Sequence, residues 1–536
     1  MRTVVLASSL TLALSSVALA SPATPTSQTT TPAPTTVVRA LTHAPVLPPG
    51  TTFKHRCSDE TGAHGCKSLV AVDSKGQVLT SNAPVGFGAP DIQAAYHIDP
   101  ALGDGVTVAV VDAFGYADLE ADLAVYRSTY GLPECTTASG CLTIVNDNGL
   151  PSPLPADNEM WIGETALDVQ MVSAACPKCK IVVVQSGADG GAGLDLGQLA
   201  ASKLGVTSIS DSWGSPESGG ELQEEGSFNN AGIGTFVSSG DAGYTGATPA
   251  YPATSNFVIS VGGTHMQIGG SGEYLEDAWS LAGSSCSLSL PKPSYQPVAA
   301  ACNNRAASDV SAVADPATGV ATYIAKQGKW QSVGGTSAAS PIVAALFAGA
   351  GHGDATPAFV YKHIDVFKDI TVGSNGNCGT NVCNAAGGWD GPTGIGSPDQ
   401  SKLKAIGGVD GAGPDVTLTY PADGDTVTKN FTIEAVPADG ALYVALEIDG
   451  TRIGALNKAP YEFSAPSALA DGAHTIKVTA FDLDHNANST SISVTQAAAM
   501  MGGGGGGGCA AGGNGASGLL AALGLGAILV RRRKTA

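Results

Sequence analysis

A serine that follows two glycines is the residue of this sequence with the clearest potential for chemistry. It is Ser337, in the segment GGTSAASPI at residues 334–342. The glycines allow a tight turn and a close approach by a substrate, and the start of the helical run that follows offers N–H groups to a developing anion. A Ser/Thr-rich helix cap without a catalytic role has the same features, so the motif indicates a nucleophile only if a base accompanies it.

The usual base for a serine nucleophile is a histidine, and neither of two candidates fits. His64 precedes the first core strand, which is the wrong place for the common order Asp, His, Ser along the chain. His265 follows a Gly-Gly-Thr turn without an accompanying motif, which is typical of a structural or surface histidine. The base must therefore be sought among other side chains.

A pair of carboxylates supplies an alternative base. Glu164 and Asp168 lie four residues apart in the segment WIGETALDVQMV at 161–172, so a helix places both on one face. Two like charges there cost stability, and the apolar neighbours Trp161 and Met171 argue against a solvated acidic face. We therefore predict that the pair acts on the serine.

Asp241 is a third acid whose position suits catalysis. It stands in the segment SGDAG at 239–243, directly after the strand-like residues 235–238. Aspartates between glycines are common in turns. The functional alternative is an acid held near the serine, where it stabilises the oxyanion.

The elements that must position these residues follow an α/β pattern from about residue 89 to 408. Short apolar runs typical of buried strands alternate with helical stretches, which predicts a parallel sheet covered by helices on both faces. The expected strands are 106–111, 181–184, 208–210, 235–238 and 257–261, and the expected helices include 160–175 and 341–350.

After a linker at 411–413, residues 414–496 have a different pattern. Apolar and polar residues alternate in runs that Asp-Gly turns separate, which predicts a small antiparallel β-sandwich of the immunoglobulin-like kind. The expected strands are 416–420, 431–435, 445–448, 474–481 and 491–494.

The composition and the N-terminus indicate export. Residues 1–20 have the positive start, apolar run and small-residue cleavage site of a signal peptide, and 21–88 form a Pro/Thr-rich leader or short propeptide.

The net charge of −20 disfavours nucleic acid as a partner. Ten of the 11 cysteines form close pairs, which suit disulfides in an oxidising compartment: Cys57/Cys66, Cys135/Cys141, Cys176/Cys179, Cys286/Cys302 and Cys378/Cys383. The third pair also matches a redox motif, but without a thioredoxin-like context.

Taken together, the motifs resemble the sedolisin family of serine-carboxyl peptidases, which have a subtilisin-like fold. The resemblance covers about 89–408 and rests on the serine motif, the Glu-x-x-x-Asp helix motif and the Ser-Gly-Asp-x-Gly motif. The shorter segments SWG at 212–214, YPA at 251–253 and VGGT at 261–264 also resemble family sequence.

The resemblance implies a role for each acid. Ser337 is the nucleophile, Glu164 the general base, and Asp168 the residue that orients Glu164. Asp241 supplies the oxyanion hole together with the backbone N–H of Ser337. Asp112, at the end of the first core strand, extends the hydrogen-bond chain to Glu164, as does Trp213.

The implied function is a secreted serine-type endopeptidase, a hydrolase that acts on protein or peptide substrates. A glutamate base must be ionised, whereas an aspartate that donates to an oxyanion must be protonated. Both conditions hold at low pH, so we expect an optimum on the order of pH 3–5.

The resemblance also implies one Ca²⁺ ion. The segments DIT at 369–371 and AGGWD at 386–390 are similar to two family elements. By that match the ligands are the side chains of Asp369 and Asp390 and the carbonyl oxygens of Ile370, Ala386 and Gly388, a set that suits the preference of Ca²⁺ for about six to eight oxygens. Ala386 departs from the usual glycine. Two ordinary loops are the alternative.

Three further features bear on maturation and location. Many sedolisins have a large N-terminal prodomain, whereas only residues 21–88 lie between the signal and the core here. The Ig-like module has no visible catalytic set and an unknown partner. Residues 497–536, with a glycine run, the unpaired Cys509, a short apolar helix and an arginine cluster, resemble a MYXO-CTERM sorting tail and imply display on the cell surface or release after cleavage.

Three alternatives compete with the endopeptidase. Tripeptidyl-peptidase activity occurs in the same family and is compatible with the sequence. A conventional subtilisin lacks support because no histidine stands in the right order. An inactive surface adhesin that displays the Ig-like domain is disfavoured by the complete set Glu164, Asp168, Asp241 and Ser337.

Overall fold

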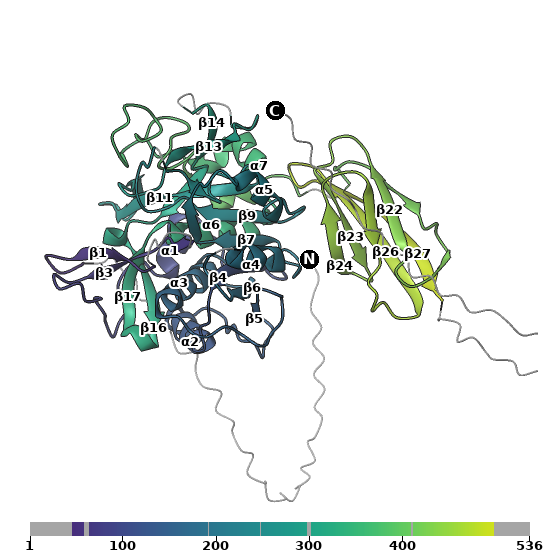
Figure 1. Cartoon of the computed structure of the whole chain (residues 1–536), viewed down its shortest axis with the longest axis horizontal. Helices are drawn as coiled ribbons and strands as arrows, with labels where there is room; N and C mark the ends of the chain where they lie inside the picture. Colours follow the sequence, from purple (N-terminus) through teal and green to yellow (C-terminus); the bar gives the residue numbers. More distant parts are fainter. Residues whose placement is uncertain are drawn as a thin grey trace, which may run out of the picture.

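The computed structural model describes residues 46–57, 64–190, 192–246, 248–296, 302–408 and 411–497. The predicted signal peptide and sorting tail lie outside these residues. Within them, no helix has both the length and the apolar character needed to cross a membrane. Figure 1 shows an α/β body beside a β-sandwich, as the two sequence patterns predict.

The body is built on one mostly parallel sheet with the strand order β12-β11-β9-β7-β4-β6-β5, and β15 pairs with β11. All neighbours run parallel except β12, which is antiparallel to β11. The strands are β4 (Thr107–Ala113), β5 (Leu142–Asn146), β6 (Lys180–Ser186), β7 (Ser208–Asp211), β9 (Gly234–Ser238), β11 (Val258–Ile268), β12 (Tyr274–Ala278) and β15 (Val310–Val313). The predicted parallel sheet is confirmed.

Helices cover both faces of this sheet. Alternate residues of β4 face two separate cores, with Val108 and Val110 in the first and Ala109 and Val111 in the second. The first core contains α1 (Ala89–Ala95), α2 (Leu119–Tyr130), α3 (Glu159–Ala175) and α6 (Thr336–Gly349), and the second contains α4 (Gly193–Ala201). Shorter helices are α5 (Glu221–Glu224), α7 (Pro357–Lys362) and α8 (Gln400–Leu403).

The helix that carries the carboxylate pair is central. The side chain of Asn158 caps α3 by accepting hydrogen bonds from the N–H groups of Met160 and Trp161, and every residue from 161 to 175 is buried. Burial on all sides rules out a solvated acidic face for Glu164 and Asp168.

The helix that carries the serine begins at Thr336, five residues before the predicted start at Pro341. The prediction placed the start of the helix at Pro341, but this proline lies inside α6. Because proline has no N–H, it cannot donate the usual helical hydrogen bond to the carbonyl oxygen of Ser337. The hydroxyl of Ser212 lies 3.4 Å from that carbonyl oxygen and shares its single hydrogen between it and Oδ1 of Asp168, which is nearer at 3.0 Å. Gly335, at φ 104°, makes the sharp turn into the helix.

Residues that precede the body also form strands. β1 (Thr52–His55), β3 (Leu69–Val72), β17 (Lys329–Gly334) and β16 (Val320–Ile324) make one antiparallel sheet, and β2 (Gly65–Cys66) joins β8 (Trp213–Pro216) and β10 (Ala250–Tyr251) in another. Two further two-stranded sheets pair β13 (Ser285–Pro291) with β14 (Asn304–Ala307) and β18 (Phe367–Lys368) with β19 (Ser397–Pro398). The predicted leader is therefore partly built into the fold.

The sandwich consists of two sheets with the orders β20-β22-β25 and β21-β27-β26-β23-β24. Its strands are β20 (Val416–Tyr420), β21 (Thr426–Val427), β22 (Thr432–Pro437), β23 (Tyr443–Ile448), β24 (Thr451–Leu456), β25 (Tyr461–Ser464), β26 (Gly472–Phe481) and β27 (Ala487–Gln496). Apolar residues such as Ile433, Leu446 and Val478 fill the space between the sheets. The sequence pattern predicted five of these strands and missed β21, β24 and β25.

Specific polar contacts join the sandwich to the body. Asp354 of the body accepts hydrogen bonds from the Tyr443 hydroxyl at 2.6 Å and from the His485 ring at 2.7 Å. Asp484 of the sandwich pairs with His363 at 2.8 Å and with Lys362 at 2.7 Å. All five predicted disulfides are present.

Candidate active site

Ser337 and Glu164 meet in the interior between α6 and α3. Both side chains are fully buried, and they are close enough for a hydrogen bond to lower the pKa of Glu164. The serine hydroxyl is turned toward the carbonyl oxygen of Ser212, 3.3 Å away. Oε1 of Glu164 accepts no hydrogen bond from any group that the structure describes, so it can receive a proton from the hydroxyl.

Burial dominates the electrostatics of Glu164 and raises its pKa to about 7. The hydrogen bond from Ser68, the nearby hydroxyl of Ser337 and the charge of Arg56 oppose this effect. The hydroxyl of Ser68 donates to Oε2 of Glu164, and Arg56 is held beside the helix by the side chains of Gln327 and Gln331. The base therefore lies in a pocket that favours its protonated form until solvent enters.

Asp168 lies one turn further along α3. Its Oδ1 accepts a hydrogen bond from the hydroxyl of Ser212 at 3.0 Å. Burial, followed by the charges of Asp112 and Glu164, raises its pKa well above the ordinary value. Asp112 is likewise fully buried, and burial and the charge of Glu164 raise its pKa. The three carboxyls thus share fewer than three negative charges, because like charges in a buried cluster cannot all ionise.

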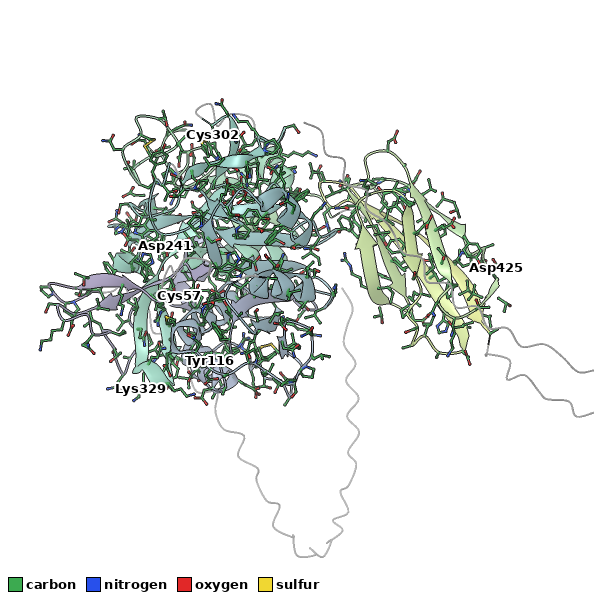
Figure 2. The ribbon with its side chains drawn as sticks, in the orientation of Figure 1. Cys57, Tyr116, Asp241, Cys302, Lys329 and Asp425 are labelled. Carbon is green, nitrogen blue, oxygen red and sulfur yellow. A yellow bond between two sulfur atoms is a disulfide. The ribbon has the colours of Figure 1, made fainter. Side chains whose placement is uncertain are left out.

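Asp241 lies on the other side of the nucleophile, where its Oδ1 anchors the start of α6. That oxygen accepts hydrogen bonds from the N–H of Thr336 at 2.8 Å and from its hydroxyl at 2.9 Å. The second oxygen, Oδ2, is buried without a partner among the described groups. Burial raises the pKa of Asp241 to about 7, so at acidic pH Oδ2 carries a proton that it can donate. Figure 2 labels Asp241 in the body.

A peptide carbonyl already lies between Asp241 and the nucleophile. The backbone N–H of Ser337 donates to the carbonyl oxygen of Lys67 at 2.9 Å. A Cβ atom placed on Gly335 would lie 2.3 Å from that oxygen and 2.6 Å from Oδ2 of Asp241. The glycine is therefore required for the close approach of backbone, acid and carbonyl.

The structure brings together all four predicted catalytic residues, Glu164, Asp168, Asp241 and Ser337. Sequence reasoning missed Ser68, Arg56 and Ser212 as their neighbours. Ser212 belongs to the SWG segment, which gave a signal, whereas Ser68 and Arg56 stand in no recognisable motif.

Trp213 differs from the expectation that it extends the carboxyl chain. Its indole N–H donates to the carbonyl oxygen of Val111 at 3.0 Å, so it braces two strand ends. His265 pairs with Asp315 at 2.8 Å, and His64 packs its ring 5.0 Å from that of Trp213. Both histidines are thus accounted for without a role as base.

The five predicted calcium ligands lie on two adjacent loops. Oδ2 of Asp369 accepts a hydrogen bond from the N–H of Gly388 at 2.9 Å, and Oδ2 of Asp390 accepts one from the N–H of Ala386 at 3.1 Å. Asp390 is fully buried and also holds Thr393. Neither carboxylate has an ion-pair partner among the side chains that the structure describes. Ile370, which directly follows Asp369 in the sequence, is also buried. Two carboxylates without a cationic side chain match the donor chemistry of Ca²⁺.

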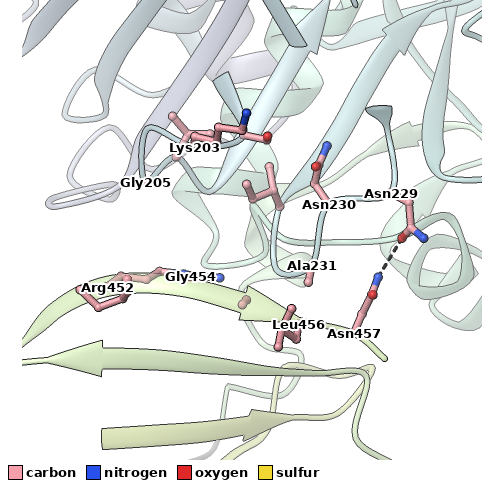
Figure 3. Close-up of a pocket in the computed structure, with 14 residues that line it drawn as sticks. Lys203, Gly205, Asn229, Asn230, Ala231, Arg452, Gly454, Leu456 and Asn457 are labelled. Carbon is pink, nitrogen blue, oxygen red and sulfur yellow. Dashed lines mark hydrogen bonds between the residues drawn. The ribbon is translucent and has the colours of Figure 1, made fainter. Parts of the chain in front are cut away.

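A separate pocket lies between the body and the sandwich (Figure 3). It is lined by residues of both parts, including Lys203 and Asn230 on one side and Arg452 and Leu456 on the other. The amide of Asn457 donates to the side chain of Asn229 at 2.8 Å along its rim. None of the predicted catalytic residues lines this pocket, so it takes no part in the site described above.

Two family models match the chain. One, the Subtilase family, matches residues 156–358, and the other, the Bacterial Ig domain, matches residues 414–478.

Individual relatives are consistent with these matches. The chain is 29% identical over 360 residues to kumamolisin from Bacillus sp. (strain MN-32), in an alignment that covers 59% of this chain and 63% of kumamolisin. It is 30% identical over 230 residues to the tripeptidyl-peptidase sed1 of Aspergillus fumigatus, which covers 32% of this chain and 35% of that protein. The chain thus spans less than two thirds of the length of either relative.

A solved structure supports the same relationship. Pseudomonas sedolisin, a serine-carboxyl proteinase in complex with pseudo-iodotyrostatin, superposes with a TM-score of 0.53 and 26% identity over 60% of this chain and 98% of sedolisin. The chain therefore contains a region similar to the sedolisin-type serine-carboxyl peptidases, followed by a region that matches a bacterial Ig domain.

Proposed function

We propose that this protein is a serine-carboxyl endopeptidase that cleaves protein or peptide substrates at acidic pH. The observation that carries the proposal is the buried carboxylate of Glu164 beside Ser337, with one oxygen that no described group occupies. The similarity to kumamolisin and sedolisin supports it.

In the proposed reaction, Glu164 removes the proton of Ser337 as the oxygen attacks the substrate carbonyl. The proton then passes from Glu164 to the departing amine, and water repeats the sequence to release the acyl group. Asp168, held by Ser212, positions Glu164 and shares its proton. The backbone N–H of Ser337 and the protonated Asp241 stabilise the oxyanion, as two converging donors do in other acyl-transfer sites.

The pH dependence follows from these roles. Asp241 loses its donor proton as the pH rises through about 7, so activity falls on the alkaline side. Glu164 must be ionised, and its full burial in this structure keeps its pKa at about 7. When a substrate cleft is open, water reaches Glu164 and its pKa moves toward the ordinary value of about 4.3. We therefore expect the maximum on added substrate to lie in the acid range.

The test uses a denatured protein substrate with the wild-type chain and with Ser337→Ala at about pH 4. We expect the wild type to release peptides and the variant to release fewer than about a thousandth as many. Equal release by both would refute the proposal, and release by neither would favour an inactive, adhesive protein.

The similarity to the tripeptidyl-peptidase sed1 keeps exopeptidase activity as a second candidate. The two activities give different products from one substrate. An endopeptidase yields internal fragments of varied length, whereas a tripeptidyl-peptidase yields successive tripeptides from the N-terminus. Mass spectrometry of the early products separates them.

We further propose that one Ca²⁺ ion binds to Asp369, Asp390 and the carbonyl oxygens of Ile370, Ala386 and Gly388. The ion would supply a positive charge that ties two loops together, and it has no part in the reaction. The buried carboxylate of Asp390, which has no ion-pair partner among the described side chains, supports this assignment.

We also propose that the protein is exported. The five disulfides support an oxidising compartment. Removal of residues 1–20 and attachment or release through the MYXO-CTERM-like tail are parts of this proposal. Sequencing both ends of the mature protein tests them, and retention of Met1 or of Ala536 would contradict the corresponding part.

A further inference from the structure

The pocket between the body and the sandwich follows an open strand edge. β24 is the last strand of its sheet, and β23 is its one partner in the part of the chain that the structure describes. Within that part, the backbone groups of residues 452–456 make no hydrogen bond outside the ladder with β23. An edge strand presents the N–H and C=O groups of alternate residues away from its partner, so this edge offers pairing to another extended chain.

The body faces this edge without covering it. The pocket has a volume of about 390 Å³, which lies in the range of about 300–1,000 Å³ that is common for ligand sites. Figure 3 shows Lys203 and Gly205 of the body across from Arg452 and Gly454 of the strand. A Cβ atom on Gly205 or on Gly454 would meet no heavy atom beyond its chain neighbours within 4 Å. The two parts therefore leave room for a further chain along β24.

The charged side chains that line the pocket are both cations, Lys203 and Arg452, and no acidic residue of the described chain lines it. Neither cation forms an ion pair with another described side chain. Glu447 lies opposite Arg452 in the ladder but pairs with Lys477 at 3.4 Å, and Arg452 donates to the carbonyl oxygen of Gly232 at 3.4 Å. In a chain with 46 acidic and 26 basic residues, this local excess of positive charge attracts anionic groups.

Asparagines connect this pocket to an apolar one. Asn229, Asn230 and Asn457 line the first pocket and also an adjoining pocket of about 290 Å³. The apolar residues of the adjoining pocket include Leu442 and Phe257, whose side chain is 40% exposed. Amide side chains both donate to and accept from a peptide backbone, and apolar walls hold an apolar side chain. We call the two pockets together the crevice; it is cationic at one end and apolar at the other.

We propose that the crevice is a second binding site, which holds an extended acidic segment of a partner protein. The segment lies along β24 as an added strand, so its backbone pairs with the outward N–H and C=O groups of that edge. Its carboxylates lie beside Lys203 and Arg452, and an apolar residue further along the segment lies beside Phe257. None of the four predicted catalytic residues lines either pocket, so binding here does not depend on the proposed reaction.

The open edge distinguishes a peptide from other anions. Charge alone attracts any polyanion, whereas an added strand also requires backbone N–H and C=O groups. A peptide whose backbone nitrogens are methylated keeps the carboxylates and loses the N–H groups. Such a peptide therefore separates the contribution of the strand edge from that of the cations.

The experiment uses the full-length Ser337→Ala protein, in which a bound peptide stays intact. The probe is a short labelled peptide of alternating glutamate and valine with a phenylalanine near one end. Fluorescence anisotropy measures its Kd at about pH 6, where its carboxylates are ionised. Two matched probes have lysine in place of glutamate or a methylated backbone. We expect the glutamate probe to bind at least about tenfold more tightly than either of them.

Two substitutions in this protein locate the site. Lys203→Glu reverses an exposed cation that lines the pocket, and Lys429→Glu makes the same change of net charge at an exposed position of the sandwich outside both pockets. We expect Lys203→Glu to weaken binding of the glutamate probe at least about threefold. Lys429→Glu should leave the Kd within about 1.5-fold at about 0.15 M salt, because salt screens distant charges.

Three results would overturn the proposal. If no probe binds, or if the glutamate and lysine probes bind equally, the crevice does not recognise an acidic peptide. If the methylated probe binds as tightly as its parent, the crevice attracts anions without adding a strand. If Lys203→Glu and Lys429→Glu have equal effects, the probe binds elsewhere. Digestion of a denatured protein by wild type is measured separately, so that the proposed function stands or falls independently of these results.

Discussion

Replacing Asp241 tests the oxyanion site, because the two oxygens of this carboxyl have separate tasks. Oδ1 accepts two hydrogen bonds from Thr336, whereas Oδ2 is buried without a partner among the described groups and lies near the Lys67 carbonyl oxygen. Asp241→Ala removes both tasks. Asp241→Asn keeps an acceptor for Thr336 and offers an amide N–H in place of the acid proton.

The expected magnitudes follow from these contacts. Loss of one oxyanion donor lowers kcat by about 10²–10³, which corresponds to about 2.7–4 kcal/mol. Asp241→Ala also leaves the N–H and hydroxyl of Thr336 without their acceptor, which costs about 1–3 kcal/mol of stability. We expect Asp241→Asn to fall between wild type and Asp241→Ala in activity, because an amide is a weaker acid than a carboxylic acid, and to be the more stable of the two variants.

The assay is kcat/KM per folded molecule on a peptide substrate, measured from about pH 3 to about pH 8, with thermal unfolding measured in parallel. Wild type loses activity as Asp241 ionises with rising pH through about 7, and Asp241→Asn has no such ionisation. If Asp241→Ala keeps more than a tenth of the wild-type kcat/KM while folded, Asp241 does not stabilise the oxyanion.

Three further outcomes are expected. Chelation with EDTA should lower the Tm of wild type by about 2 °C for each kcal/mol of stabilisation that is lost, but leave that of Asp390→Ala unchanged; an equal response of both proteins would contradict the calcium assignment. Asp309→Asn should destabilise the body by about 3–5 kcal/mol in denaturant unfolding, because it leaves the buried guanidinium of Arg305 unpaired; a loss below about 1 kcal/mol would contradict this. Burial opposes the charge on both His485 and Asp354, but their hydrogen bond and opposite charges outweigh it, so the pKa of His485 is raised and that of Asp354 lowered. This pair should hold the sandwich on the body most firmly between about pH 4 and about pH 6.5 and weaken on either side. Limited proteolysis of the linker at 411–413, measured inside and outside that range, can check this; a rate independent of pH would refute it.

The main features of the fold were predictable because local signals agree with tertiary burial. β4 and β6 are apolar runs whose residues are nearly all buried, so composition alone marks them. β7 (SISD) and β9 (GTFVS) are also buried, but they place only one or two large apolar side chains between small and polar residues. The apolar sequence of α3 and its cap Asn158 define that helix equally well. β24 escaped detection because its residues are only partly buried and do not alternate. Pro341 gave a false helix start because the hydroxyl of Ser212, between β7 and β8, contacts the carbonyl oxygen of Ser337 that lacks its backbone donor.

The site was predictable only where a motif spans its residues. Glu164 and Asp168 share one helix, and Thr336 and Ser337 share one turn, so sequence spacing brings each pair together. The position of Lys67 and Ser68 depends on pairing with β8 and β17, which are about 145 and 265 residues further along the chain. No local pattern in residues 64–70 indicates that pairing, so the sequence alone places them in a leader or short propeptide.

The most direct test of the acid base is the kcat/KM of Glu164→Gln on a peptide substrate, with Glu159→Gln as the matched control on the exposed start of the same helix. Glutamine keeps the size and hydrogen-bonding capacity of the side chain but cannot take the proton of Ser337. We predict that Glu164→Gln loses about 10²–10⁴ of the wild-type value and that Glu159→Gln stays within about twofold of it. A Glu164→Gln protein that folds and works within about tenfold of wild type would show that a different group removes the proton.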